Sequence, residues 1–471
     1  MEMIREYLNE PIVGIIAPAG YGKTEEIANA VSLCLGKQLI LTHTRAGVAA
    51  LRDRMKRKCI SNENYELDTI ASFCLKWCKA YPLTANVQIP SKINEIDYLE
   101  IYKGAERVFS FSWAQKVIKQ TYSGLFVDEY QDCTESQHAV FMSLVKSLPI
   151  RIFGDPLQGI FYWVKDDKIV NWNLFSFKII SPLKIPWRWE KANKDLGRLL
   201  DSLRKELIVS LKGESVTIRL ANVPQCMTIL SSAQWNNGGY VYGVKGFKSI
   251  VFLSTSTIKQ KYFSQHNGGY FQCDEVKDLA EAEAIVEAIE LQEKEKKALL
   301  LLERLKDMVN GIQTELGSYI NNLKKGKSDF SRINKQKDFG QLINNICIEN
   351  SPQSILDALR WIRNSKDFKM YRKELFYRIE RTYSYMVEEG VSLREATEAL
   401  NGQQHFTEKR FNFPRLSSRT VLSKGLEFDC VIIDAREKMD VRDFYVAMTR
   451  AQKYIFIISD EIQLSFDGIQ Y

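Results

Sequence analysis

Short runs of apolar, mostly β-branched residues recur along the chain, and segments with helical spacing separate most of them. Runs of this kind predict β-strands. In chain order the runs are IVGII, QLILTH, GLFVDE, IRIFGD, FKII, SIVFLS, DCVIID and KYIFIISD. The alternation of strands with helices predicts the α/β class. Eight runs are too many for one compact sheet, so we expect two parallel sheets.

A long region from about 279 to 405 breaks this pattern. It has helical apolar spacing and dense charge but no convincing strand. The stretch KKGKSDFSRINKQKD within it is typical of a polar loop. The region is therefore expected to be helical, and its charges to form either a solvated helix face or a binding surface.

Composition narrows the class of protein. Of 471 residues, 45% are hydrophobic and 11% aromatic, which is enough for two to four cored domains and excludes a largely disordered chain. No apolar run approaches the roughly 20 residues of a membrane span, so no membrane partner is expected. Nine cysteines without a CxxC pair indicate reduced thiols and a cytoplasmic location. The net charge of +7 is compatible with a polyanionic partner.

The first chemical signal is the stretch APAGYGKTEEI, which follows the first apolar run. Ala17 to Thr24 fit the phosphate-binding pattern [AG]-x4-G-K-[ST]. Gly20 and Gly22 let successive N–H groups point at one anion, and the following helix adds its positive end. Lys23 is expected to reach the β- and γ-phosphates, and Thr24 to ligate Mg²⁺. A tight turn that matches by chance is the alternative.

The second signal is GLFVDEYQDCTESQ, where two acidic residues follow a buried run. A phosphate turn needs a carboxylate for its magnesium ion, and Asp128 is the expected ligand. Glu129 is the expected base for the attacking water. Adjacent carboxylates of this kind favour hydrolysis over transfer to a bound acceptor, whereas an ordinary acidic loop is the alternative.

Together with IFGDPLQGIF, the segment DEYQD resembles the second and third motifs of superfamily 1 DNA helicases of the UvrD/Rep type. The resemblance implies that Gln158 couples the γ-phosphate to the DNA site. It also places Phe161 and Trp163 where family aromatics stack on bases. Taken singly, either aromatic is more typical of a core than of a stacking platform, but the position directly after GDPLQ favours the platform.

Further motifs of the same family follow in order. The segment LILTHTRAGVAALRDRM resembles its single-strand-contacting motif, with Thr42 and Arg45 at matching positions. The segment DTIASFC resembles another DNA-contacting motif, although Ile70 and Ala71 replace its aromatic and histidine residues.

The second half of the nucleotide site is also implied by the resemblance. In PWRWEKANKDL, Trp187 replaces a tyrosine that stacks on adenine, and Arg188 matches an arginine that reaches the γ-phosphate. In RTVLSKGLEFDCVII, Glu427 is placed for the ribose. In FYVAMTRAQKYIFI, Arg450 stands at the arginine-finger position.

The resemblance implies two RecA-like motor domains with a small insertion in the first and a larger helical one in the second. The interval of 105 residues from Lys23 to Asp128 leaves room only for a small first insertion. The expected boundaries are motor domain 1A at 1–180 with an insertion at about 80–110, motor domain 2A at 181–278 and 406–471, and a helical insertion at 279–405.

The expected function is an ATP- and Mg²⁺-dependent 3′→5′ translocase or helicase acting on single-stranded or tailed duplex DNA. One alternative is a nucleic-acid-sensing ATPase switch that regulates a partner nuclease, as compact UvrD-like proteins do in anti-phage systems of the Gabija type. A nucleotide-binding scaffold without turnover is a third, less favoured possibility, since Glu129 and Arg450 are both present.

Overall fold

The computed structural model describes residues 2–90, 96–161, 166–220, 224–238, 244, 246–267, 269–274, 279–404 and 413–470. Up to residue 231 its main elements are α1 (Glu2–Leu8), β1 (Ile12–Ile16), α2 (Lys23–Leu33), β2 (Gln38–Thr42), α3 (Arg45–Arg57), β3 (Tyr65–Thr69), α4 (Ile70–Ala80), α5 (Pro82–Ala85), α6 (Tyr98–Ser110), α7 (Ser112–Thr121), β4 (Gly124–Val127), η3 (Tyr130–Asp132), α8 (Glu135–Leu144), β5 (Ile150–Gly154), η4 (Pro156–Gln158), β6 (Lys178–Ile180), α9 (Trp187–Glu190), α10 (Lys194–Leu207), β7 (Val216–Arg219) and β8 (Met227–Leu230).

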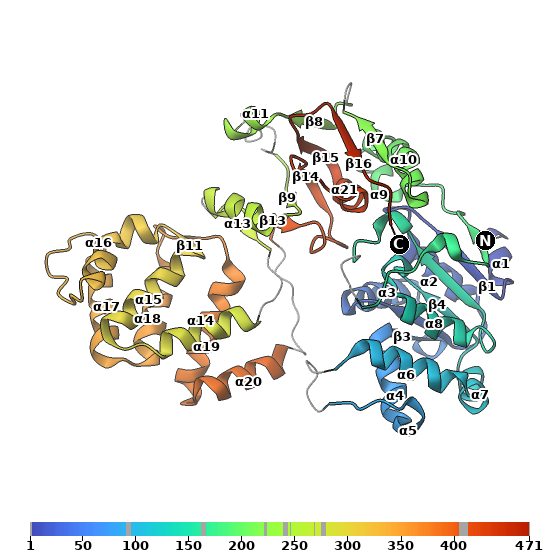
Figure 1. Cartoon of the computed structure of the whole chain (residues 1–471), viewed down its shortest axis with the longest axis horizontal. Coiled ribbons are helices and arrows are strands. Elements are labelled where there is room, and N and C mark those ends of the chain that lie inside the picture. The colour runs from blue at the N-terminus through green and yellow to red at the C-terminus, as the bar shows by residue number, and fades with distance from the viewer. Residues whose placement is uncertain are drawn as a thin grey trace. The chain divides into compact units, whose positions relative to one another are not determined.

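The later elements complete the chain (Figure 1). They are α11 (Ser232–Asn236), β9 (Ile250–Ser254), α13 (Thr257–His266), β10 (Gln272–Cys273), α14 (Leu279–Glu290), α15 (Lys294–Lys306), β11 (Val309–Asn310), α16 (Ile312–Lys324), α17 (Lys337–Glu349), α18 (Pro352–Asn364), β12 (Lys369–Met370), α19 (Lys373–Glu389), α20 (Leu393–Gln404), β13 (Arg415–Arg419), β14 (Phe428–Asp434), α21 (Val441–Met448), β15 (Ala451–Ile458) and β16 (Gln463–Phe466).

The strands form two six-stranded sheets, with the orders β3-β2-β4-β5-β1-β6 and β10-β13-β9-β14-β15-β8. Every strand pair that the structure describes within these two sheets is parallel. Each of the eight apolar runs overlaps a strand. The predicted α/β class is therefore confirmed, and two parallel sheets with flanking helices are the arrangement of two RecA-like domains.

The chain divides into two compact units, residues 1–232 with 436–471 and residues 233–435. In the first unit, the central strands β2 and β5 are buried along their whole length. Strands covered on both faces need no polar alternation, which is why the sequence showed them as continuous apolar runs. The edge strand β3 has the sequence YELDT, and it was not predicted because its polar residues form no apolar run.

The described residues between 80 and 110 of the first unit are mostly helical. Helix α6 packs against α4 and α8. Its residues Ile101 and Val108 belong to the same buried cluster as Leu125 and Val127 of β4. Residues 91–95 of the expected small insertion lie outside the described residues. The domain boundaries drawn from the sequence remain a prediction.

In the second unit, β9 and β14 are fully buried, and β13 is buried through polar residues. Ser417 and Ser418 are both 0% exposed. The Ser417 hydroxyl donates to the Gln260 carbonyl at 2.9 Å, and the Ser418 hydroxyl donates to the Asp274 carboxylate at 2.7 Å. Because each buried hydroxyl has a partner, the strand RLSSR is stable in a core although its sequence does not predict one.

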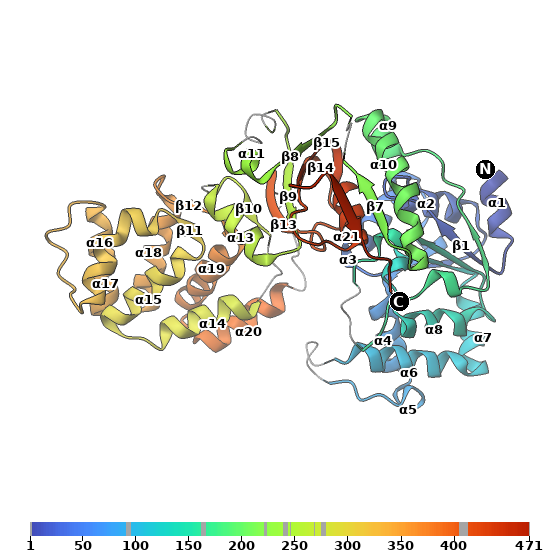
Figure 2. The same ribbon diagram turned by 45° about the horizontal axis from the view of Figure 1, so that its top comes forward.

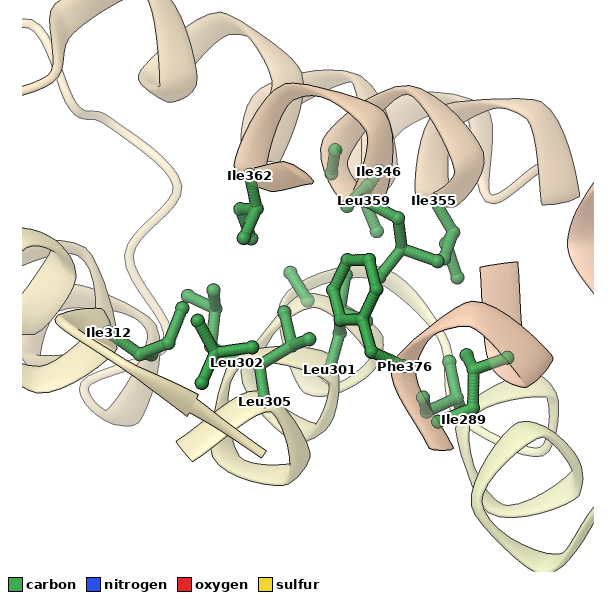
Figure 3. Packing of buried hydrophobic residues seen from close by; sticks show 14 of the residues in the cluster. Ile289, Leu301, Leu302, Leu305, Ile312, Ile346, Ile355, Leu359, Ile362 and Phe376 are labelled. Carbon is green, nitrogen blue, oxygen red and sulfur yellow. The ribbon is translucent and has the colours of Figure 1, made fainter. Parts of the chain in front are cut away.

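Helices α14 to α19 of the second unit gather around a core of their own (Figures 1 and 2). Apolar side chains from each of these helices enter it, and Figure 3 shows how they face one another. The labelled members are Ile289, Leu301, Leu302, Leu305, Ile312, Ile346, Ile355, Leu359, Ile362 and Phe376. The predicted helical region is thus confirmed. It also holds the two-residue strands β11 and β12, which pair antiparallel and were not expected.

Several charged residues of this region are buried and do not lie on a solvated face, among them Lys297, Arg372 and Glu380. Lys297 is 1% exposed, and its ammonium group lies 3.1 Å from the Glu290 carboxylate. The Tyr383 hydroxyl donates to the same carboxylate at 3.0 Å. These contacts join α14, α15 and α19, so the dense charge of the sequence serves internal packing at this position.

In the part of the chain that the structure describes, no helix has the length and apolar character needed to cross a membrane.

The helical core yields a stability prediction. Leu302 is 0% exposed, and Leu302→Ala should lower the free energy of unfolding by about 2–5 kcal/mol because it leaves a cavity. Leu291 is 75% exposed, and Leu291→Ala should change it by no more than about 0.5 kcal/mol. Urea unfolding followed by circular dichroism measures both. Equal destabilisation by the two substitutions would contradict the core described here.

Candidate nucleotide site

The predicted phosphate turn connects β1 to α2. Gly20 and Gly22 have φ values of 75° and 84°, in the left-handed region that glycine adopts without a steric penalty. Ala17 is buried, and its amide donates to the Gly154 carbonyl at 3.0 Å. Lys23 is 8% exposed, and its ammonium group donates to the Ala17 carbonyl at 3.2 Å. The lysine thus folds back over the turn, where a phosphate would replace the carbonyl as its partner.

A hydroxyl and a carboxylate meet beside this turn. The Thr24 hydroxyl donates to the Asp128 carboxylate at 3.3 Å, and Asp128 is 3% exposed. Burial and the nearby Glu129 carboxylate raise the pKa of Asp128 to about 7, although Lys23 opposes the rise. A buried carboxylate next to a hydroxyl oxygen is a donor set of the kind Mg²⁺ prefers, so the residues fit the predicted metal site.

The predicted base, Glu129, has a left-handed backbone with a φ of 57°. This conformation is energetically unfavourable for residues other than glycine, and it is often retained at functional sites. Its amide donates to the Asp128 carboxylate at 2.9 Å, and its own carboxylate accepts from the side-chain amide of Gln131. Both contacts fix the direction of the turn after β4.

The third predicted motif adjoins the second. The Asp155 amide donates to the Gln131 side-chain carbonyl at 3.0 Å. The predicted sensor Gln158 is 5% exposed and donates to the Asp155 carboxylate at 2.7 Å. Glu129, Gln131, Asp155 and Gln158 therefore form one continuous series of hydrogen bonds.

Both predicted arginines meet at Thr449. The Arg188 amide donates to the Gly20 carbonyl at 3.1 Å, and its guanidinium donates to the Thr449 carbonyl at 2.7 Å. Arg450 is 3% exposed; its guanidinium donates to the Val446 carbonyl at 3.1 Å and to the Thr449 hydroxyl at 3.0 Å. Segments far apart in the sequence are therefore joined at the edge of the phosphate turn.

Trp187 is 58% exposed and lies beside the phosphate turn. A Cβ atom added at Gly22 would be 3.3 Å from its indole ring. An exposed indole at this place is available for stacking on a planar base.

Four of the remaining predicted residues are described by the structure. Thr42 is buried at the end of β2, and Arg45 is exposed at the first position of α3. Phe161 is half-buried shortly after η4. Glu427 is exposed in the second unit, just before β14. Trp163 lies outside the described residues.

Three residues of the site were not singled out from the sequence. Gln131 and Asp155 lie inside the quoted motifs, and the hydrogen bond between them links the two motifs. Arg204 of α10 donates to the Asp155 carboxylate at 2.6 Å, and both side chains are buried. No local pattern around Arg204 signals this contact, because its partner is 49 residues away.

Comparison with known proteins gives a family match for the first part of the chain. Residues 1–162 match the family model of an AAA domain. This part of the chain contains β1, α2, β4 and η4. The Gabija protein GajB of Bacillus cereus (strain VD045) is 34% identical over 77 residues. That match covers 14% of this chain and 16% of the relative.

Among solved structures, Arterivirus nonstructural protein 10 (helicase) is similar both with DNA and alone, at 9% identity and a TM-score of 0.36. The alignments cover 98% of this chain and 63% and 62% of the viral chains. This chain thus spans less than two thirds of each of these relatives. At this TM-score the likeness adds nothing to the fold assignment.

The close approach at Gly20 can be tested. An alanine Cβ there would lie 2.8 Å from the Trp189 ring and 2.9 Å from the Arg188 Cβ, at a φ of 75°. Gly20→Ala should therefore weaken ADP binding by about tenfold or more, where tenfold corresponds to about 1.4 kcal/mol. Titration of a fluorescent ADP analogue measures the change.

The matched control is Gly213→Ala, at a φ of 85° with no atom within 4 Å of the added Cβ. It should cost about 1–2 kcal/mol of stability through backbone strain and leave nucleotide affinity unchanged. Equal affinity in the two variants would rule out the steric role given to Gly20.

Proposed function

We propose that this chain is an ATP-dependent 3′→5′ translocase or helicase on single-stranded DNA, hydrolysing ATP between two RecA-like domains. The observation that carries the proposal is the convergence of Lys23, the Thr24–Asp128 pair and Arg188 around one phosphate turn. A tight turn or an acidic loop without a nucleotide-binding role does not require these groups to lie together. The AAA-domain match over residues 1–162 supports nucleotide use.

Each group has a distinct role in hydrolysis. Thr24 and Asp128 would hold Mg²⁺, which offsets negative charge on the β- and γ-phosphates when bound. Lys23 exchanges the Ala17 carbonyl for a phosphate oxygen. Glu129 accepts a proton from the attacking water, while Gln131 holds its carboxylate in place.

The arginines act on the charge that develops during hydrolysis. Arg188 and Arg450 are proposed to offset this charge on the γ-phosphate, and Gln158 to sense its departure. The shared contacts with Thr449 support a joint movement of the two arginines. Trp187 is proposed to stack on the base and Glu427 to bind the ribose.

DNA is proposed to contact Thr42, Arg45, Phe161 and Trp163. Bases stacked on aromatic side chains typically gain about 1–3 kcal/mol each, with little dependence on sequence. Arg45, exposed at the start of α3, is suited to contact phosphate. The helical region 279–405, with its separate core, is proposed as an insertion that regulates the motor or receives a partner.

The partial match to the Gabija protein GajB supports a second candidate function. In it, nucleotide turnover and nucleic-acid binding would license a partner nuclease in anti-phage defence, with little strand separation. The nucleotide site serves both functions equally. They differ in whether ATP hydrolysis moves the chain along DNA.

The first test concerns the proposed base. Glu129→Gln should keep nucleotide affinity but reduce kcat by about 10²–10⁴-fold, because only proton transfer is removed. Glu135→Gln, an exposed neighbour in the first turn of α8, should behave as wild type. Steady-state ATPase assays with and without single-stranded DNA decide this. Wild-type turnover in purified Glu129→Gln would falsify the assignment.

The second test separates the two candidate functions. Duplexes with a 3′ or a 5′ single-stranded tail should be compared for strand separation, together with displacement of streptavidin from a biotinylated strand end. We expect ATP-dependent displacement in the 3′→5′ direction and weak unwinding, since opening a base-pair step costs about 1.4 kcal/mol. DNA-stimulated hydrolysis without displacement would favour the switch instead. Unwinding only from a 5′ tail would contradict the proposed polarity.

A further inference from the structure

Helix α10 carries a buried arginine that the proposed mechanism does not use. The Arg204 side chain is 8% exposed, and its Nη1 atom lies 2.6 Å from Oδ1 of Asp155, whose side chain is 0% exposed. Two charges withdrawn from water in this way interact strongly with each other. Breaking such a pair leaves an uncompensated buried charge.

The same carboxylate reaches the catalytic turn. Oδ2 of Asp155 accepts from Gln158 at 2.7 Å, and the Asp155 amide donates to Gln131 at 3.0 Å. Gln131 in turn holds the Glu129 carboxylate. A displacement of Asp155 would therefore move the groups proposed to sense the γ-phosphate and to activate water.

On its other side, Arg204 reaches α21. Its guanidinium lies over the Tyr445 ring, 5.5 Å from the ring centre. Burial raises the pKa of the Tyr445 hydroxyl, and Arg204 and the backbone of Ala19 in the phosphate turn oppose the rise. Helix α21 ends at Met448, immediately before Thr449 and Arg450.

We infer that Arg204 is a positioning residue that couples the turn bearing Gln158 to the helix that leads to Arg450. The inference rests on the proposed function and goes beyond it. Because the guanidinium holds Asp155 and Tyr445 together, a shift of Gln158 on loss of the γ-phosphate must be followed by α10 and α21. Arg204 touches no reacting atom in this scheme, and its effect is on geometry.

The main variant is Arg204→Met, which keeps an unbranched apolar stem against Tyr445 and removes the charge. Misplacement of reacting groups should lower kcat by about 10- to 100-fold, as small errors of position do. The KM for ATP and the Kd for ADP should change by less than about threefold, because the phosphate turn itself is intact. Arg204→Lys, which can keep one contact with Asp155, should recover part of kcat.

Two further proteins separate position from folding. The double variant Arg204→Met/Asp155→Asn removes both buried charges and should regain thermal stability lost in Arg204→Met, without regaining kcat. Arg198→Met is the matched control, since Arg198 lies on the same helix and its side chain is 78% exposed. It should leave kcat, KM and the melting temperature unchanged.

The outcomes are distinct. Parallel loss of kcat, ADP affinity and melting temperature in Arg204→Met, all restored in the double variant, would reduce Arg204 to a structural residue and overturn the inference. Wild-type kcat in Arg204→Met would also overturn it. If wild type hydrolyses ATP but DNA has no effect, the proposed DNA function fails while basal kcat still decides the role of Arg204. Absence of hydrolysis in wild type overturns both.

Discussion

A carboxylate that is cut off from water needs cations or hydrogen-bond donors, and two such carboxylates organise the candidate site. Asp128 is 3% exposed and Asp155 is 0% exposed. The first has a raised pKa and lies beside Thr24 and Lys23, a setting in which a bound divalent cation would stabilise its charged form. The second is neutralised within the chain by Arg204. The first carboxylate is thus suited to a ligand and the second to a fixed connection.

The topology of the first sheet explains why these groups meet. Strands β4, β5 and β1 are neighbours in the order of the sheet, and they run parallel. The loops that follow parallel strands emerge at the same edge, where α/β proteins generally place their ligand sites. The phosphate turn, the acidic turn and the turn of Gln158 each follow one of these strands. Their proximity is a consequence of strand order.

The helical region has a buried core of its own. Its buried cluster, as far as the structure describes it, draws all its members from residues between Ala282 and Ala396. The side chains of this region thus form a core that is separate from the buried clusters of the first unit. The buried Lys297 ammonium is paired with the Glu290 carboxylate within this region.

The sequence by itself determined the strands with continuous apolar runs, the helical region and the contiguous turns at Gly20 to Thr24 and Asp128 to Glu129. These features depend on neighbours within a few residues. A turn that needs glycine, or a buried apolar run, can therefore be recognised from a short stretch of sequence. The polar strand β13 and the edge strand β3 were not predicted from the sequence, because their burial depends on tertiary partners and not on their own residues. Only the tertiary structure could pair Asp155 with Arg204 across 49 residues, or Arg188 with Thr449 across 261. A buried ion pair depends on which elements exclude water together, and no short segment carries that information.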